Sequence, residues 1–379
     1  MDALTYTIDR DYVRQLFLEL VQLDSPSLSE AAVASKCAKE LETLGFQVTF
    51  DDAGTALGGN TGNLLAYLPG EPDCKTALLA AHMDTVQPGE GVRPRVDDAG
   101  VVWSGGDTVL GADDKAGLTA ILAGLRALRQ SGLRHGPIQV VFTIAEEMGL
   151  QGAKHLDASC LRADAGLSLD AGGSLGTIVV AGPAQAKWRA VFTGKAAHAG
   201  VAPERGISAI RVAAQAVSRM PHGRLDEATT VNVGSFVGQG PTNVVRDKVT
   251  LEGEARSLDE DALTRVLENI GQVFQETAAE HRASAEYEYT LMYHGFHFDE
   301  HHPVRKAVET AVRAAGFAPH PVKSGGGSDA NIFTSKGVPT VNIGIGYEDI
   351  HSTSEHVALR DVERAAAVVV EFLRTLSSE

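Results

Sequence analysis

The chain has 379 residues, 44% of them hydrophobic and 22% charged, which is typical of a folded globular protein and long enough for two domains. Its formal net charge of −16 argues against nucleic acid or an anionic membrane as a partner. Cys37, Cys74 and Cys160 lie far apart, without the spacing of a metal-ligand pair or a disulfide framework, and so favour a reducing cytoplasm. We expect no signal peptide in "MDALTYTIDRDYVRQLF", and no apolar run is long enough to span a bilayer.

The first half of the chain alternates strand-like and helix-like segments, and the pattern returns near the end. Helices are predicted at residues 16–23, 30–44, 114–130 and 361–376. Short apolar runs predict strands at residues 46–50, 63–69, 76–85, 137–145, 165–170 and 339–346. Strands alternating with helices indicate an α/β fold with a mainly parallel sheet flanked by helices.

The middle of the chain has a different order of elements. Strands are predicted at residues 187–194, 229–238, 248–257 and 285–293, and helices at 206–220 and 259–282. The resulting β-α-β-β-α-β order is the ferredoxin-like α+β pattern. We therefore expect a discontinuous domain of residues 1–183 and 292–379, with a second domain of residues 184–291 inserted into it.

Acidic residues and histidines gather where the predicted strands end. His82 and Asp84 close one strand, two residues apart and so on one face, where the carboxylate can orient a metal-binding imidazole. Asp113 and Asp114 precede a helix, and capping of that helix is the ordinary alternative for them. For the first pair, the alternative is an ordinary polar surface.

Two adjacent glutamates, Glu146 and Glu147, follow the next strand, and Asp170 and His351 occupy similar places further along. A solvated loop explains each group separately. Together they point to one edge of the sheet, where sites form in open α/β folds. Carboxylates with imidazoles and no cysteine suit zinc, or else manganese or cobalt.

Five stretches in order, "AHMDTV", "GADDKAG", "TIAEEMGLQGA", "SLDAGG" and "DIHSTSEH", resemble the motifs of the co-catalytic di-zinc peptidase family. That family includes peptidase T, carboxypeptidase G, aminoacylase and succinyl-diaminopimelate desuccinylase. Nearly the whole chain resembles it, and the peptidase T-like members most. The resemblance implies a zinc-exopeptidase-like sheet with residues 184–291 as a lid and dimerisation domain.

The resemblance also implies a set of roles around two Zn²⁺ ions per subunit, for which Mn²⁺ or Co²⁺ could substitute. The implied metal ligands are His82, Asp113, Glu147, Asp170 and His351. Asp113 would bridge the ions, Asp170 would join His82 on one, and Glu147 would join His351 on the other. In the catalytic set, Glu146 would be the general base for a metal-bridging water, and Asp84 would orient His82.

Residues outside this cluster are expected to contact the substrate. The resemblance implies that His198 stabilises the oxyanion and that Asn243 and Arg256 hold a carboxylate end, as guanidinium groups do well. A solvated histidine and an ordinary ion pair are the alternatives for His198 and Arg256. Gly326 and Ser328 lie in the glycine loop "KSGGGSDANIF", which would let a substrate backbone approach closely.

The expected function is that of a cytoplasmic di-zinc aminopeptidase, or tripeptidase, acting on short peptides. Because "TIA" precedes the glutamate pair where peptidase T has Pro-Asp, an N-acyl amino acid amidohydrolase or a carboxypeptidase of the same family remains an alternative. A non-catalytic metal- or peptide-binding protein is a third, against which the presence of Glu146 speaks. We further expect a homodimer formed through the lid, with His198 acting in the neighbouring subunit's site.

Overall fold

The computed structural model describes residues 6–378. The predicted absence of a signal peptide rests partly on residues 1–5, which lie outside this range. The chain forms two compact units. Among the described residues, the first contains residues 6–180, 298–324 and 328–378, and the second contains residues 181–297 and 325–327.

The main sheet of the first unit has the strand order β1-β2-β6-β3-β7-β16-β8-β14, with β15 pairing to β8. The strands are β1 (Gln47–Phe50), β2 (Leu64–Leu68), β3 (Ala77–His82), β6 (Ile138–Thr143), β7 (Ala165–Ala171), β8 (Thr177–Gly182), β14 (Phe296–His297), β15 (His320–Lys323) and β16 (Thr340–Gly344). The four central strands β6, β3, β7 and β16 run parallel, and antiparallel pairs extend the sheet on both sides. The predicted mainly parallel sheet is thus confirmed.

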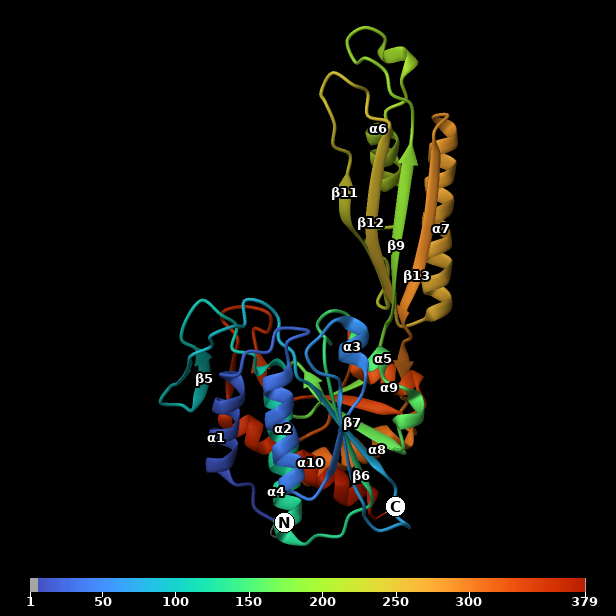
Figure 1. Ribbon diagram of the computed structural model, residues 1–379. Coiled ribbons are helices and arrows are strands. Elements are labelled where there is room, and N and C mark those ends of the chain that lie inside the picture. Colours follow the sequence, from blue (N-terminus) through green and yellow to red (C-terminus); the bar gives the residue numbers. More distant parts are fainter. Residues whose placement is uncertain (1–5, 379) are drawn as a thin grey trace. The chain divides into compact units, whose positions relative to one another are not determined.

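Helices flank this sheet (Figure 1). They are α1 (Arg10–Val21), α2 (Ala31–Thr43), α3 (Ala53–Leu57), α4 (Ala112–Ser131), α5 (Gln151–His155), α8 (Pro303–Ala314), α9 (Asp329–Ser335) and α10 (Leu359–Leu376), with a 3₁₀ turn at Ala158–Cys160. The helix α4 is buried along most of its length and packs on β3, β7, α1 and α10. The helix α1 begins six residues earlier than predicted, because Asp9 caps it by accepting the Tyr12 N–H.

A small second sheet carries the loop that holds His351. Its order is β17-β18-β5-β4, with β4 (Pro94–Val96), β5 (Val101–Ser104), β17 (Tyr347–Glu348) and β18 (His356–Ala358). The strands are too short to show a period in the sequence, and none of them was predicted. His351 lies between β17 and β18, at a positive φ of 60°.

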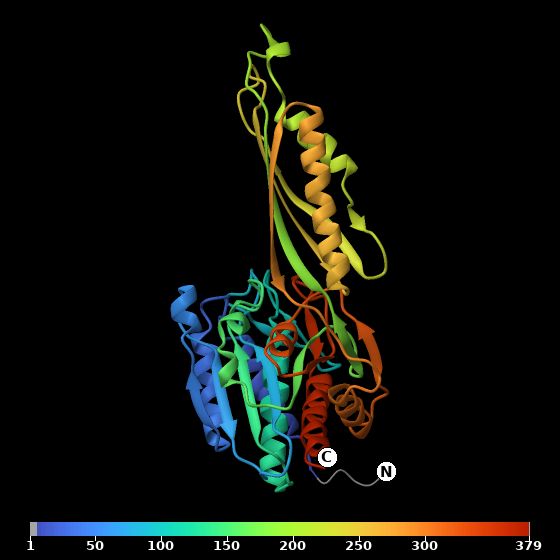
Figure 2. The ribbon, with the colours of Figure 1, turned by 90° about the vertical axis from the view of Figure 1, so that its right-hand side faces the viewer.

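The second unit is an antiparallel sheet covered by helices α6 and α7 (Figure 2). Its elements are β9 (Ala184–Thr193), a 3₁₀ turn (Pro203–Arg205), α6 (Ala209–Arg219), β10 (Gly223–Arg224), β11 (Thr229–Val237), β12 (Lys248–Ser257), α7 (Glu260–Glu280) and β13 (Ser284–Tyr293). The strand order is β10-β11-β12-β9-β13. Apart from the short β10, the chain order follows the predicted β-α-β-β-α-β pattern. The role of residues 184–291 as a lid and dimerisation domain stays a prediction.

Candidate active site

The polar residues singled out in the first unit converge at the carboxyl ends of its parallel strands. His82 is the last residue of β3, Asp170 is the next-to-last residue of β7, and the glutamate pair follows β6. Asp113 stands at the start of α4, and His351 comes from the loop between β17 and β18. Since carboxyl ends of parallel strands share one sheet edge, residues far apart in sequence meet there.

The two glutamates lie outside the regular geometry of β6, because the strand ends before them and the backbone turns at Ala145. The strand β6 ends at Thr143, and Ala145 has a positive φ of 49°, which a side-chain-bearing residue seldom adopts. After it, the two main-chain N–H groups of Glu146 and Glu147 point to one carboxylate, that of Asp84, at 2.9 and 3.2 Å. The alternation expected of a regular strand therefore does not apply to this pair.

Two further side chains hold the residues just before the glutamates. The Ile144 N–H donates to Asn63 Oδ1, and the Ala145 N–H donates to Glu30 Oε1, both at 3.0 Å. With Asp84, these side chains accept four successive backbone N–H groups, an arrangement that we call the amide clamp. All three side chains are buried. Glu30 and Asn63 were not predicted as site residues, because a glutamate at a helix start and an asparagine before a strand look ordinary.

The metal-ligand candidates form one connected cluster around Asp113. His82 Nε2 lies 3.1 Å from Asp113 Oδ1 and 3.6 Å from Asp170 Oδ1. His351 Nε2 lies 3.3 Å from Asp113 Oδ2 and 2.9 Å from Glu147 Oε1. One carboxylate oxygen of Asp113 thus faces each histidine, as a bridge between two cations requires.

The orientation of His82 is set mainly by the backbone of Asp84. The Nδ1 atom of His82 is 2.9 Å from the Asp84 main-chain oxygen and 3.5 Å from its carboxylate. Because a carbonyl oxygen can only accept, Nδ1 carries the proton and Nε2 is left as the ligand atom. The Asp84 carboxylate itself binds the glutamate backbone and the Ser27 hydroxyl, the latter at 2.6 Å.

The acids of the cluster are crowded. Burial raises the pKa of Asp170 to about 7. Burial, together with the charge of Asp170, raises the pKa of Glu146 and of Asp114 well above the usual range of carboxyl groups. These buried carboxyl groups do not readily carry their negative charges at the same time. A bound cation would stabilise their ionised forms.

The two histidines have the opposite shift. Burial lowers the pKa of His82, but hydrogen bonds to Asp113 and Asp170 outweigh it and raise the pKa well above its usual value. Hydrogen bonds to Asp113 and Glu147 raise the pKa of His351 to about 10. Both imidazoles are therefore stabilised as cations beside the carboxylates. A divalent metal ion bound there would supply this positive charge in place of the two protons.

The donor atoms fit divalent metal ions. Ligand atoms of His82, Asp114 and Asp170 lie within 4.8 Å of one another, as do those of His82, Asp113 and Glu147. Of the two adjacent aspartates, Asp114 is the poorer ligand, since its oxygens accept backbone N–H groups of His82 (3.2 Å) and of the first turn of α4 (3.1 Å). Imidazole nitrogens with carboxylate oxygens are a donor set suited to zinc, manganese or cobalt.

Two further buried side chains, which were not predicted from the sequence, bind the main chain of the candidate ligands. Glu355 accepts the main-chain N–H groups of Gly111 (2.7 Å) and Asp113 (2.9 Å). Asn342 exchanges two hydrogen bonds with the main chain of Asp170, at 2.8 and 2.7 Å. A signal existed for Asn342, which is a polar amide in the middle of the mainly apolar run "PTVNIGIG".

His198 and Asn243 lie side by side in the second unit, beyond the carboxyl end of β9. Both are exposed, and the Ala199 N–H donates to the Asn243 main-chain oxygen at 2.8 Å. The Nδ1 atom of His198 accepts the N–H groups of Gly200 and Val201 at 3.2 Å. A neutral His198 therefore carries its proton on Nε2, where it could be donated to a ligand.

Arg256 lies at the other end of the same sheet, opposite Gln185 at the start of β9. Its Nε donates to Glu254 at 2.9 Å, so it does form an ion pair. Gly326 is exposed in the glycine loop, whereas Ser328 forms a capping box with Asn331 at the start of α9. The structure thus brings the first-unit residues together but separates His198 and Asn243 from Arg256 within the second unit.

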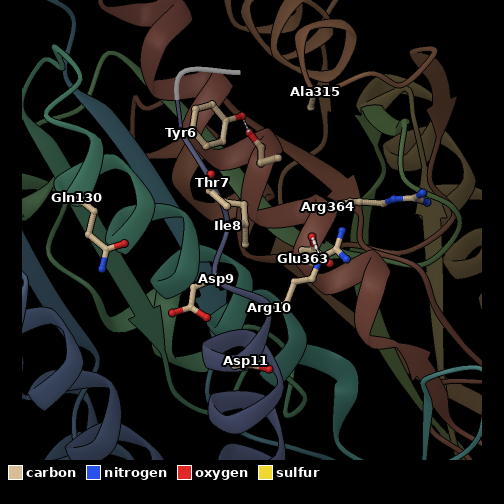
Figure 3. A pocket seen from close by; sticks show the side chains of 11 residues that line it. Tyr6, Thr7, Ile8, Asp9, Arg10, Asp11, Gln130, Ala315, Glu363 and Arg364 are labelled. Carbon is tan, nitrogen blue, oxygen red and sulfur yellow. Dashed lines mark hydrogen bonds and ion pairs between the residues drawn. The ribbon is translucent and has the colours of Figure 1, made fainter. Parts of the chain in front are cut away.

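A pocket of about 740 Å³ lies elsewhere in the first unit, beside the segment that precedes α1 (Figure 3). Arg10 and Glu363 form an ion pair of 2.8 Å on its wall. The residues that line it come from residues 6–11, α4, α10 and the end of α8, and the predicted site residues are not among them. The pocket is therefore separate from the candidate active site. No helix within residues 6–378 combines the length and the apolar character needed to cross a membrane.

Comparisons with known proteins agree with the geometry. An aminopeptidase PepT from Bacillus cereus ATCC 10987 is 41% identical, with a TM-score of 0.93, over 97% of this chain and 99% of that chain. A tripeptidase from Staphylococcus aureus subsp. aureus Mu50 is 38% identical, with a TM-score of 0.95, over 98% and 100% of the two chains. Uncharacterized protein YqjE of Bacillus subtilis (strain 168) is 43% identical over 357 residues, which are 94% of this chain and 96% of that protein.

The match to a family model spans residues 78–375, which include every predicted site residue. Together with identities near 40% over almost the full length of two solved structures, this match assigns the chain to one family. The chain is a member of peptidase family M20/M25/M40.

Proposed function

We propose that this protein is a peptidase T-like aminopeptidase that hydrolyses short peptides, tripeptides among them, with two zinc ions in the cluster around Asp113. The observation that carries the proposal is the division of the Asp113 oxygens between His82 and His351. The similarity to a PepT aminopeptidase and to a tripeptidase supports the substrate class.

The proposed ligands form two sets that share one carboxylate. His82 and Asp170 would hold one ion, His351 and Glu147 would hold the other, and Asp113 would bridge them. When bound, such ions acidify water and stabilise negative charge on a carbonyl oxygen. Zinc suits the donor set best, with Mn²⁺ or Co²⁺ as substitutes.

Glu146 has the chemistry of a general base next to these ligands. Its carboxylate belongs to neither proposed ligand set, and burial raises its pKa, so it has a higher proton affinity than an ordinary carboxylate. In the proposed mechanism, it takes a proton from the attacking water and gives it to the leaving amine. The amide clamp fixes the backbone of Glu146 and so limits its movement during both transfers.

The test is hydrolysis of matched substrates by the zinc-loaded protein. A panel would pair tripeptides and dipeptides with N-acyl amino acids, and product analysis would show which end is released. We expect release of the amino-terminal residue from short peptides and little turnover of N-acyl amino acids. Preferred turnover of N-acyl amino acids, or release of the carboxyl-terminal residue, would overturn the aminopeptidase assignment. Metal binding without any turnover would indicate a binding protein.

We also propose a cytoplasmic homodimer formed through the second unit, with His198 acting in the partner's site. The length of β9 supports this proposal. Arg256 faces Gln185, and Thr193 at the other end of the strand is eight positions further along, roughly 26 Å at about 3.3 Å per residue. His198 lies beyond that end. A tripeptide spans only about 10 Å, less than this backbone separation, which favours His198 and Arg256 of one subunit contacting different substrate molecules.

Mixing inactive variants tests the exchange of His198. If it acts in trans, a dimer of one His198→Ala and one Glu146→Ala subunit has one intact site, and activity returns on mixing. If it acts in cis, every site keeps one defect and mixing restores nothing. Sedimentation of the wild type as a monomer would exclude the dimer directly.

A further inference from the structure

Three side chains form a row across the sheet of the second unit. Arg256 on β12 stands directly opposite Gln185 on β9, which stands opposite Tyr293 on β13. Glu254 precedes Arg256 by two residues, so both side chains project from the same face of β12. The row therefore sets an ion pair beside an amide and a phenol at one end of the sheet.

Glu254 holds Arg256 along one edge of the guanidinium group. The Nε atom of Arg256 donates to Glu254 Oε1 at 2.9 Å, and its Nη2 atom approaches Glu254 Oε2 at 3.4 Å. The amide of Gln185 donates to the same Oε2 at 2.6 Å, and Gln185 is buried. Both oxygens of Glu254 are thus occupied, and its carboxylate is held from two strands.

The glycine segment 325–327 closes the other side of this arrangement. Nη1 of Arg256 approaches the Gly325 oxygen at 3.4 Å. A Cβ atom placed on Gly327 would lie 2.4 Å from the Tyr293 ring, so a larger residue there would have to displace the ring. These contacts engage one N–H each on Nε, Nη1 and Nη2 of Arg256. A guanidinium has about five N–H groups, so roughly two, on its Nη1/Nη2 side, remain for a ligand.

We propose that Glu254 is a positioning residue that presents Arg256 to the free α-carboxylate of a peptide substrate. An arginine side chain loses rotamer freedom when it binds, and holding it in place beforehand lowers that cost. Glu254 also neutralises the guanidinium charge, so binding depends on the bidentate fit more than on charge alone. The inference rests on the proposed peptidase function and adds to it the residue that sets the preference for an unblocked carboxyl terminus.

The experiment compares one tripeptide with its carboxyl-terminal amide as substrates of the zinc-loaded dimer. For the free acid, Glu254→Ala should raise KM about tenfold and change kcat little. Glu254→Gln retains an acceptor oxygen for Nε and should stay within about threefold of wild type. Neither variant should change KM for the amide. Glu252→Ala is the matched control, because Glu252 lies two residues earlier on the same strand in an exposed pair with Arg189 at 3.6 Å.

Arg256→Ala separates the possible outcomes. It should remove the preference for the free acid, and adding Glu254→Ala to it should have no further effect. An unchanged or lower KM for the acid with Glu254→Ala, or an equal change for acid and amide, would overturn the positioning role. Wild-type protein that cleaves acid and amide equally would overturn the carboxylate subsite but leave the peptidase function. Wild-type protein that cleaves neither peptide would overturn both.

Discussion

The most informative single change in the site is Asp84→Asn. Asp84 is fully buried, and its carboxylate accepts three hydrogen bonds, from the Glu146 and Glu147 N–H groups and from the Ser27 hydroxyl. Asparagine has the same shape but only one acceptor oxygen. Its amide group would face at least one main-chain N–H, so one charge-assisted hydrogen bond is lost and a buried donor is left unpaired.

The expected size of the effect follows from that count. A hydrogen bond to a charged group contributes about 1.5–3 kcal/mol. Because about 1.36 kcal/mol corresponds to a tenfold change in rate, loss of this contribution from the positioned glutamates lowers kcat/KM roughly 10- to 150-fold. The assay is tripeptide hydrolysis at saturating zinc, with bound metal measured on the same samples.

Asp97→Asn is the control for this experiment. Asp97 also accepts two main-chain N–H groups through its carboxylate, those of Ala99 and Val101 at 2.9 Å, but in an exposed hairpin. It should keep wild-type kcat/KM. If Asp84→Asn stays within about threefold of wild type when zinc is bound, the amide clamp does not position the glutamates. If excess zinc fully restores activity, Asp84 acts through the orientation of His82 instead.

Three further predictions concern the same cluster. Glu146→Ala should lower kcat roughly 10²–10⁴-fold while metal analysis shows near-normal content; lost metal would mean that the two glutamates have exchanged roles. Asp113→Ala should weaken the binding of both ions and Asp170→Ala chiefly of one, as measured by calorimetric titration; equal loss of one ion in both would contradict the bridge. Burial raises the pKa of Glu30 to about 6 from its ordinary value of 4.5, so its stabilising protonated form is lost as the pH rises through 6. Wild type should therefore lose stability relative to Glu30→Gln as the pH rises. In urea titrations, the unfolding free energy of Glu30→Gln minus that of wild type should increase by about 1–2 kcal/mol from pH 4 to pH 8, and a pH-independent difference would refute this.

The parallel sheet and its cluster could be predicted because each signal is local. The strand β3 is a buried apolar run that ends in His82, and Asp113 lies at the start of an amphipathic helix. Such patterns are visible within a window of a few residues. The family resemblance then supplied the roles that spacing alone left open.

The amide clamp could not be predicted because its partners are remote. Glu30 and Ala145 are 115 residues apart, and Asn63 and Ile144 are 81 apart. A carboxylate that accepts backbone N–H groups leaves no periodic trace in the sequence. The small sheet around His351 was missed for a different reason, since its strands have only two to four residues each.

The two histidines differ greatly in their access to solvent. The side chain of His82 is 2% exposed, whereas that of His351 is 48% exposed on a loop between two short strands. Ligand exchange is faster where water and competing chelators can reach the metal. The ion on the His351 side would therefore leave first during dialysis against a chelator, and the protein would pass through a state with a single ion. In a cell with fluctuating metal supply, this side of the site would set which metal the enzyme carries, while the His82 side would retain its ion.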